Sequence, residues 1–227
     1  NDAGTNASNP QPDPPPANPA ATSPTSNLKT DAIISTDLGD IEIALYDDTP
    51  KHKANFLKLA AEGYYNGTGF HRIIRGFMIQ GGDPYSKEGE TGRPGTGGPG
   101  YTQNAEIVPT RFHKKGALAA ARQGDAVNPE RKSSGSQFYI VHGTPKSDAD
   151  LANIGNYLGQ KFPGYQFSEA QKNAYKTIGG TPELDNDYTV FGEVVKGMDI
   201  VDKIATVKTK PGDAPETPVR MTVKVAE

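Results

Sequence analysis

The chain has 227 residues, a length that suggests one domain with additional material or two small domains. Its hydrophobic share of 34% and its mean hydropathy of -0.64 are low for a compact domain, so part of the chain is not expected to pack. A formal net charge of -3 provides no basic excess to neutralise phosphates, which argues against a nucleic-acid partner. The absence of cysteine excludes disulfides, thiolate catalysis and cysteine-based zinc sites, and no apolar run is long enough for a membrane span.

Residues 1–28 are rich in Asn, Pro, Ala, Ser and Thr and carry almost no large apolar side chains. Such a segment cannot bury enough apolar surface to offset its chain entropy, so it is predicted to be a disordered, proline-stiffened linker. A polar tether in a chain that starts at Asn1 favours an extracytoplasmic protein, periplasmic or lipid-anchored at the cell envelope, although a cytoplasmic location stays open. Residues 29–227 are predicted to form the folded domain.

Short strand-like runs are spread along that domain. The first two, residues 32–36 and 41–46, are separated by turn residues and predict a hairpin. Further strands are expected in GALAAA, SQFYIVHG and YTVFGEVV, and VRMTVKVA is expected to close the chain as a strand. Many short strands with only two framework helices indicate a β-barrel or a sandwich rather than alternating βαβ units.

The two framework helices are predicted in TPKHKANFLKLAAEG and GMDIVDKIATV. The first has Thr49 as its N-cap and Pro50 at the first helical position, and His52, which lies between two lysines, is expected to be solvated. Residues 145–182 have a different character, because their apolar residues follow helical spacing and Ser168 is a candidate helix cap. This segment is predicted to be a helical insertion.

Several common functional motifs are weak or missing. The segment GTGGPG, residues 95–100, formally matches a dinucleotide-binding pattern, but no strand precedes it and no helix follows it, so a flexible loop is favoured. The four histidines lack the spacing of a metal site, and no serine lies in a nucleophile-elbow context. We therefore expect no metal and no cofactor. For His71, a structural hydrogen-bonding role and a direct functional role stay equally open.

The stretch GFHRIIRGFMIQGGDP, residues 69–84, is the main functional candidate. Alternate residues of a strand share a face, so Met78 and Gln80 can point the same way while Ile79 points into the core. Arg72 lies beside apolar surface and needs a hydrogen-bond acceptor. From spacing alone, a structural ion pair and a functional role for Arg72 are about equally favoured.

The same stretch strongly resembles the first signature of the cyclophilin family of peptidyl-prolyl cis-trans isomerases. SSGSQFYIVHG, residues 133–143, and LDNDYTVFGEVVKGMDIV, residues 184–201, resemble the second and third signatures in the expected order. The resemblance implies a mainly β fold, an eight-stranded antiparallel closed β-barrel capped by two α-helices, here with the helical insertion. It also implies an isomerase that accelerates rotation of X-Pro peptide bonds during protein folding, without a metal or a cofactor.

The resemblance also implies roles for individual residues. By motif position, Arg72 corresponds to the family's catalytic arginine, and Gln80 corresponds to the glutamine that orients the arginine and the substrate backbone. Arg75 is expected to be a surface charge. The proline pocket is implied to be lined by Phe77, Met78, Tyr139 and Leu184, and further groove positions fall on His71, Ala121, Arg122, Gln137 and Tyr188.

Four positions depart from the best-known members of the family. Tyr139 stands where Phe is usual and adds a hydroxyl at the pocket floor, while Arg122 and Tyr188 stand where eukaryotic members have Asn and His, as in bacterial members. Glu183 stands where many members carry a Trp that contributes to cyclosporin binding. A cyclosporin-type inhibitor is therefore expected to bind with weakened affinity.

The expected partners are proline-containing polypeptides, and the protein is expected to be a monomer. One alternative is a cyclophilin-like chaperone module that binds proline-containing segments and whose catalysis is incidental. Another is self-recognition, because the X-Pro bonds of the N-terminal segment could occupy the groove of the same or a neighbouring chain.

Overall fold

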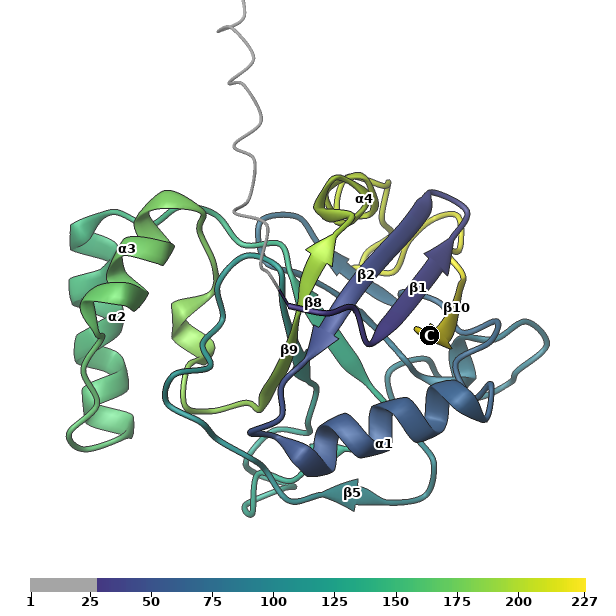
Figure 1. Ribbon diagram of the computed structural model, residues 1–227, viewed down its shortest axis with the longest axis horizontal. Coiled ribbons are helices and arrows are strands. Elements are labelled where there is room, and N and C mark those ends of the chain that lie inside the picture. Colours follow the sequence, from purple (N-terminus) through teal and green to yellow (C-terminus); the bar gives the residue numbers. More distant parts are fainter. Residues whose placement is uncertain (1–27) are drawn as a thin grey trace, which may run out of the picture.

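The computed structural model describes residues 28–227, so the linker predicted for residues 1–28 lies almost entirely outside the described residues. The described part contains one eight-stranded antiparallel sheet with the strand order β10-β1-β2-β9-β6-β8-β4-β3, and a separate ribbon in which β5 pairs with β7 (Figure 1). The strands are β1 (Ala32–Thr36), β2 (Gly39–Leu45), β3 (Arg72–Ile74), β4 (Met78–Gly81), β5 (Thr102–Gln103), β6 (Ala117–Ala120), β7 (Ser133–Ser134), β8 (Phe138–Val141), β9 (Val190–Lys196) and β10 (Met221–Val225).

The sheet is open, which differs from the expected closed barrel. Strands β3 and β10 are the two edge strands of the described sheet and do not pair with each other. The segment that precedes β3 contacts the start of β10: an isolated bridge joins Gly69 to Arg220, Phe70 N–H donates to the Val219 carbonyl at 3.0 Å, and Met221 N–H donates to the Thr68 carbonyl at 2.7 Å. Because β3 has only three residues and starts after this contact, no continuous ladder closes the sheet.

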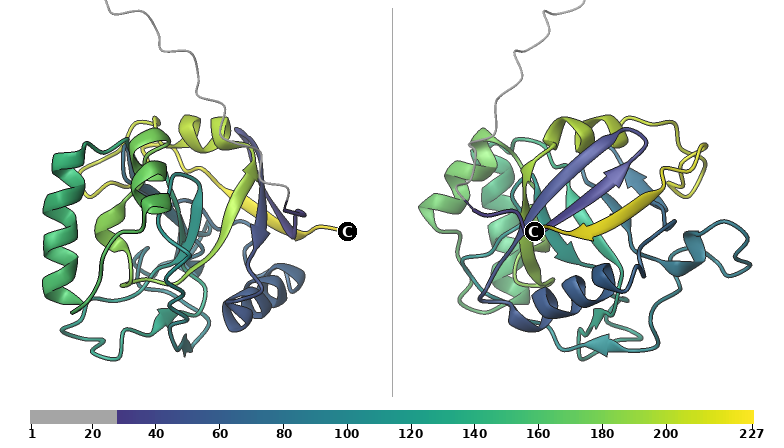
Figure 2. Two further views of the ribbon diagram at one scale, coloured as in Figure 1. Left: turned by 60° about the vertical axis from the view of Figure 1, so that its left-hand side comes forward. Right: turned by 45° about the vertical axis from the view of Figure 1, so that its right-hand side comes forward.

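Within residues 28–227, four α-helices accompany the sheet. α1 (Pro50–Ala61) and α4 (Met198–Ile204) lie at opposite ends of it, as expected for two framework helices (Figure 1). α2 (Asp148–Lys161) and α3 (Glu169–Thr177) stand together to one side of the sheet, which confirms that the segment predicted as an insertion is helical (Figures 1 and 2). Ser168 caps α3 in a reciprocal arrangement with Gln171, as its position in the sequence suggested. Within residues 28–227, no helix has the length and apolar character to cross a bilayer.

The start of α1 is capped by a residue that the sequence did not indicate. Thr49 occupies the N-cap position, but its hydroxyl donates to the Tyr46 carbonyl instead of capping the helix. The Glu106 carboxylate accepts the N–H groups of Lys51 and His52 at 3.1 and 2.9 Å, and it also contacts the His52 ring Nδ1 at 2.6 Å. His52 is only 4% exposed, so the prediction that it is solvated is wrong. The reason is tertiary, because the loop that carries Glu106 covers this turn.

Strands β4, β6 and β8 bury both of their faces. Ile79, Leu118 and Ile140 point into the main core, which confirms the core position predicted for Ile79. Their neighbours along the strands point the other way, because side chains alternate across a sheet. On that second face they form a separate apolar cluster whose buried members are Tyr46, Met78, Ala117, Ala119, Ala121, Tyr139, Val141 and Val190. The second face carries the candidate site.

Candidate functional site

Three of the predicted site residues stand in one row across the sheet. Strand β3 pairs with β4 so that Arg72 lies opposite Gln80, and β4 pairs with β8 so that Gln80 lies opposite Tyr139. Directly opposed residues in antiparallel strands have Cβ atoms about 5 Å apart, so their side chains are neighbours. The register therefore places a guanidinium, an amide and an aromatic ring side by side.

A small cavity opens beside this row. Its volume is about 100 Å³, and it combines two guanidinium groups and one amide with several apolar side chains. Two of the predicted residues, His71 and Gln137, do not line it. The structure brings the other predicted residues together around it: Arg72, Phe77, Met78, Gln80, Ala121, Arg122, Tyr139, Leu184 and Tyr188.

Arg72 has a carboxylate partner as well as a place at the cavity. Its Nε lies 3.5 Å from Oδ2 of Asp213, and the two side chains are 45% and 43% exposed. The Asp213 backbone is fixed, because its carbonyl accepts the N–H of Ile73 at 2.8 Å and its own N–H donates to Lys210. The structural ion pair left open for Arg72 is therefore present, and the residue also lies at the cavity, where a functional role stays a prediction. No motif points to Asp213, and the local signal in the sequence is the Pro211-Gly212 turn that precedes it, where Gly212 has a φ of 93° in the structure.

Gln80 makes a different contact from the one expected. Its Nε2 donates to Oε1 of Gln137 at 3.2 Å, and Gln137 Nε2 donates in turn to Asp83 at 3.1 Å and to the Gly97 carbonyl at 2.8 Å. Among residues 28–227, no hydrogen bond joins Gln80 to Arg72. The Gln80 amide is thus held from the side of Gln137, and its carbonyl oxygen is left as an acceptor.

The glycine-rich segment that formally matched a dinucleotide motif is a loop bound to a buried carboxylate. Asp83 accepts the N–H groups of Gly95 and Gly97, the latter at 3.0 Å. A Cβ at Gly97 would lie 2.4 Å from the Asp83 carboxylate, so only glycine fits there. The loop forms one wall of a larger hollow of about 680 Å³, which also touches Gln80 and Gln137. The loop interpretation of the segment is therefore confirmed.

His71 does not line the cavity. Both of its ring nitrogens are screened from solvent and have no hydrogen-bond partner within the described part of the chain. Burial lowers the pKa of His71, so the neutral ring is favoured. No contact of His71 in the described residues supports either a structural hydrogen-bonding role or a direct functional role. Residues 28–227 also contain no group of three or more His, Asp or Glu side chains that could hold a metal ion.

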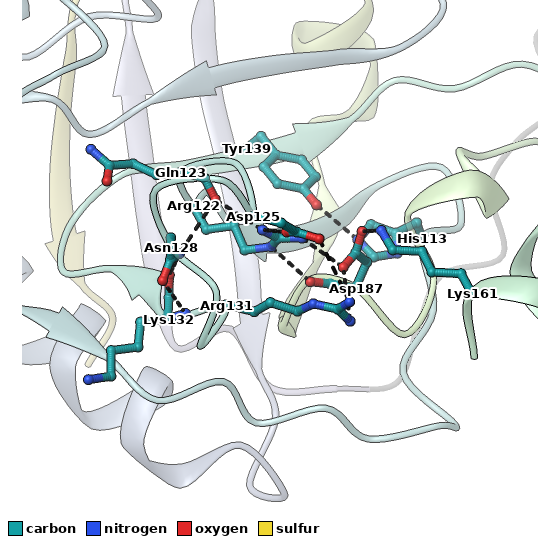
Figure 3. Close-up of polar contacts among 10 residues, drawn as sticks. All are labelled: His113, Arg122, Gln123, Asp125, Asn128, Arg131, Lys132, Tyr139, Lys161 and Asp187. Atoms are coloured by element: carbon teal, nitrogen blue, oxygen red, sulfur yellow. Dashed lines mark hydrogen bonds and ion pairs between the residues drawn. The ribbon is translucent and has the colours of Figure 1, made fainter. Parts of the chain in front are cut away.

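Arg122 is held by its neighbours. Its Nη1 donates to Asp125 at 2.6 Å, its Nη2 donates to Asp187 at 2.7 Å, and its Nε donates to the Asp187 carbonyl (Figure 3). The guanidinium also lies over the Tyr188 ring, 4.6 Å from its centroid. Most of its donors are used, so Arg122 shapes the wall of the cavity and has little capacity left to bind a ligand.

Tyr139 at the floor of the cavity uses its hydroxyl away from the cavity. The oxygen lies 2.9 Å from Nε2 of His113, a residue that does not line the cavity (Figure 3). Burial raises the pKa of Tyr139 well above its ordinary value, so the hydroxyl keeps its proton. The sequence analysis did not single out His113, because it lies far from Tyr139 in the chain and outside the three signature motifs.

Comparison with known proteins assigns the chain to a family. The model of the "Cyclophilin type peptidyl-prolyl cis-trans isomerase/CLD" family matches residues 32–225. A protein of Staphylococcus saprophyticus assigned to the peptidyl-prolyl cis-trans isomerases is 36% identical over 184 residues, which cover 81% of this chain and 84% of that protein. An Arabidopsis thaliana peptidyl-prolyl cis-trans isomerase is 35% identical over 190 residues, which cover 83% of this chain and 90% of that protein.

The fold agrees with this relationship. A crystal structure of a Cryptosporidium parvum cyclophilin-type peptidyl-prolyl cis-trans isomerase superimposes with a TM-score of 0.63 at 24% identity, over 87% of this chain and 98% of the other. That likeness concerns the fold alone, whereas the family model and the relatives concern the sequence. Together with the geometry of the site, they show that this chain belongs to the cyclophilin-type peptidyl-prolyl cis-trans isomerase family.

Proposed function

We propose that the cavity binds the proline ring of an X-Pro segment and that Arg72 promotes rotation of the preceding peptide bond. Resonance gives this amide double-bond character, and the barrier to rotation is about 20 kcal/mol. In the twisted transition state the nitrogen is pyramidal, and its lone pair accepts a hydrogen bond better than in the planar amide. A guanidinium held beside that nitrogen therefore binds the transition state more tightly than the ground state.

The observation that carries the proposal is the cross-strand row of Arg72, Gln80 and Tyr139 beside the apolar cavity. A cavity of about 150 Å³ holds benzene, so a cavity of about 100 Å³ suits a five-membered ring rather than an indole. With the ring anchored there, the carbonyl side of the peptide bond can turn. One preorganised donor is worth about 3 kcal/mol, roughly a hundredfold in rate, and anchoring of the ring supplies the rest.

The proposed role of Gln80 is to hold the substrate backbone and, once substrate is bound, the Arg72 guanidinium. Its donor side is occupied by Gln137, which leaves its carbonyl oxygen free to accept an N–H. A planar guanidinium can give one N–H to such an acceptor and still offer others to the substrate, which a lysine ammonium cannot do with fixed geometry. Proline-containing peptides are the proposed substrates, and a Cryptosporidium parvum cyclophilin was crystallised in the presence of the dipeptide Ala-Pro.

The test is an isomerisation assay on a proline-containing peptide. We expect Arg72→Ala to lower kcat/KM by about a hundredfold and to leave the fold intact, because the side chain is half exposed. Arg75→Ala is the matched control, because Arg75 follows β3 in the same hairpin, is exposed and lies outside the cavity. Equal rates for wild type and Arg72→Ala would exclude the mechanism. If both also bind the peptide, the chain is a proline-peptide binding module.

A further inference from the structure

We propose that the insertion, residues 145–182, positions the floor of the proline pocket through a buried chain of hydrogen bonds. The chain runs from Tyr175 in α3 through Asp185 and His113 to the hydroxyl of Tyr139. His113 and Asp185 are then positioning residues, because they act on the ligand through Tyr139. The inference rests on the proposed binding of proline in the cavity.

The end of the hydrogen-bond chain next to the pocket is buried and closely packed. Tyr139 is 4% exposed and His113 is fully buried, and their rings stack with an interplanar angle of 12° and a centroid distance of 6.0 Å. The hydroxyl of Tyr139 meets His113 Nε2 at 2.9 Å (Figure 3). A phenol that finds its partner behind the pocket can present the apolar part of its ring to the cavity. Without that partner, the hydroxyl would be buried and unsatisfied.

His113 is oriented from its other side by Asp185. Oδ1 of Asp185 accepts the backbone N–H of His113 at 2.9 Å and lies 2.9 Å from the ring Nδ1. An ionised carboxylate can accept hydrogen bonds but cannot donate them, so Nδ1 carries the proton in this pair. In the neutral imidazole, Nε2 is then the acceptor for the Tyr139 hydroxyl. Asp185 thus fixes both the rotation of the ring and the nitrogen that meets Tyr139.

The insertion supplies the donors to the second oxygen of Asp185. Oδ2 accepts the hydroxyls of Tyr175 at 2.6 Å and Tyr165 at 3.1 Å, and Gln171 Nε2 approaches it at 3.4 Å. Asp185 is 2% exposed, so its carboxylate depends on these protein donors in place of water. Removal of the insertion's hydroxyls would leave a buried carboxylate under-bonded next to His113.

The backbone fixes the insertion at the same point. Thr181 N–H donates to the His113 carbonyl at 2.9 Å, directly after Gly180. A Cβ at Gly180 would lie 2.3 Å from the His113 carbonyl oxygen and 2.6 Å from the Tyr175 ring, so the segment cannot pack this closely with any other residue. A second tether joins α2 to the wall of the cavity, where Lys161 at the end of α2 pairs with Asp187 and Asp187 also accepts from Arg122 (Figure 3).

The consequence concerns binding more than the chemical step. Tyr139 lines the cavity that holds the proline ring in both the ground state and the transition state. Loss of its anchor would let the ring turn its hydroxyl towards water through the cavity, which would obstruct proline. An effect shared by both states raises KM and leaves kcat nearly unchanged, whereas loss of Arg72 lowers kcat.

Two substitutions of His113 test separately the hydrogen bond to Asp185 and the hydrogen bond to Tyr139. In His113→Asn the side-chain amide reaches the position of Nδ1 and keeps the bond to Asp185, but nothing reaches Tyr139. In His113→Gln the amide reaches the position of Nε2 and can still bond the Tyr139 hydroxyl. We expect His113→Asn to raise KM by roughly tenfold with kcat changed less than about twofold, and His113→Gln to recover most of this loss.

A double-mutant cycle tests whether the effect passes through the hydroxyl. In the Tyr139→Phe background no hydroxyl needs an anchor, so His113→Asn should change KM by less than about twofold. The role of the insertion is tested with Tyr175→Phe, which keeps the ring and removes only the donor to Asp185. KM should rise by roughly threefold when Tyr139 is present and should not change in the Tyr139→Phe background. Tyr157→Phe is the matched control, because Tyr157 lies in α2 and is 52% exposed.

The dissociation constant of the same peptide, measured by calorimetry, separates this inference from the proposed catalysis. Wild-type protein that binds the peptide without isomerising it would contradict the proposed function. The hydrogen-bond chain would still be supported if His113→Asn raised the dissociation constant only when Tyr139 is present. Equal shifts in both backgrounds, or no shift in any variant, would overturn it. If His113→Asn does not fold, Tyr175→Phe in the two backgrounds gives the same decision.

Discussion

The pair formed by Arg72 and Asp213 predicts a measurable contribution of a second carboxylate to the reaction. Asp213→Asn removes the charge that lies 3.5 Å from Arg72 Nε. The substitution preserves the turn, because Asn accepts the φ of 66° at this position and the backbone carbonyl still binds Ile73 N–H. A change in activity would therefore report the lost ion pair and not a displaced loop.

The size of the effect follows from distance and exposure. Two unit charges 3.5 Å apart attract by about 1 kcal/mol in water and by about 5 kcal/mol at an effective dielectric constant of 20. The pair is nearly half exposed, so the lower end applies, and exposed pairs contribute about 0.2–1 kcal/mol. If the pair orients the guanidinium for the substrate, kcat/KM should fall by about 1.4- to 5-fold.

The assay is peptide isomerisation at low and at high salt. The loss in Asp213→Asn should shrink near 1 M salt, where the screening length falls to about 3 Å. In the Arg72→Ala background Asp213→Asn should have no effect, since there is no guanidinium left to orient. An Asp213→Asn enzyme that is faster than wild type would refute the reasoning, because the carboxylate would then compete with the substrate for Arg72.

Two further predictions concern stability. Burial lowers the pKa values of His52, His71 and His142, so the folded state binds fewer protons than the unfolded state. The contribution of these histidines to the free energy of unfolding is present above the unfolded pKa of about 6.5 and is lost as pH falls below it. The urea midpoint should therefore be lower at pH 5.5 than at pH 7.5. An unchanged midpoint would contradict the burial argument. Glu106→Ala removes the cap of α1 and the partner of His52, and it should lower the free energy of unfolding by about 1–2 kcal/mol in urea titrations, with Glu106→Gln intermediate.

The sequence predicts most of the strands and the face of β4 that carries Met78 and Gln80. Alternation along MIQG predicted that Met78 and Gln80 share a face opposite Ile79, and the two apolar clusters show this division. Ser168 predicted the start of α3, because a side chain bonding its own backbone is a local interaction, and Pro50 marked the start of α1 although its cap comes from the distant Glu106. The three signature motifs predicted the family and contain every residue that lines the cavity except Ala121 and Arg122.

The remaining features arise between segments that are distant in the chain. Whether the sheet closes depends on where β3 begins relative to β10, which no local pattern encodes. Asp213 lies 141 positions after Arg72 in the chain, and His113 reaches Tyr139 from a segment outside the motifs.

Residue type and short-range spacing are enough to assign the strand faces, the starts of α1 and α3, and the family. The partners of the buried and charged side chains follow from long-range packing, which no local pattern encodes. Spacing alone leaves Arg72 between a structural ion pair and a functional role, and the fold places both Asp213 and the cavity next to its guanidinium. A polar side chain takes whichever partner the packed chain brings within about 3 Å, and that choice is fixed by long-range packing.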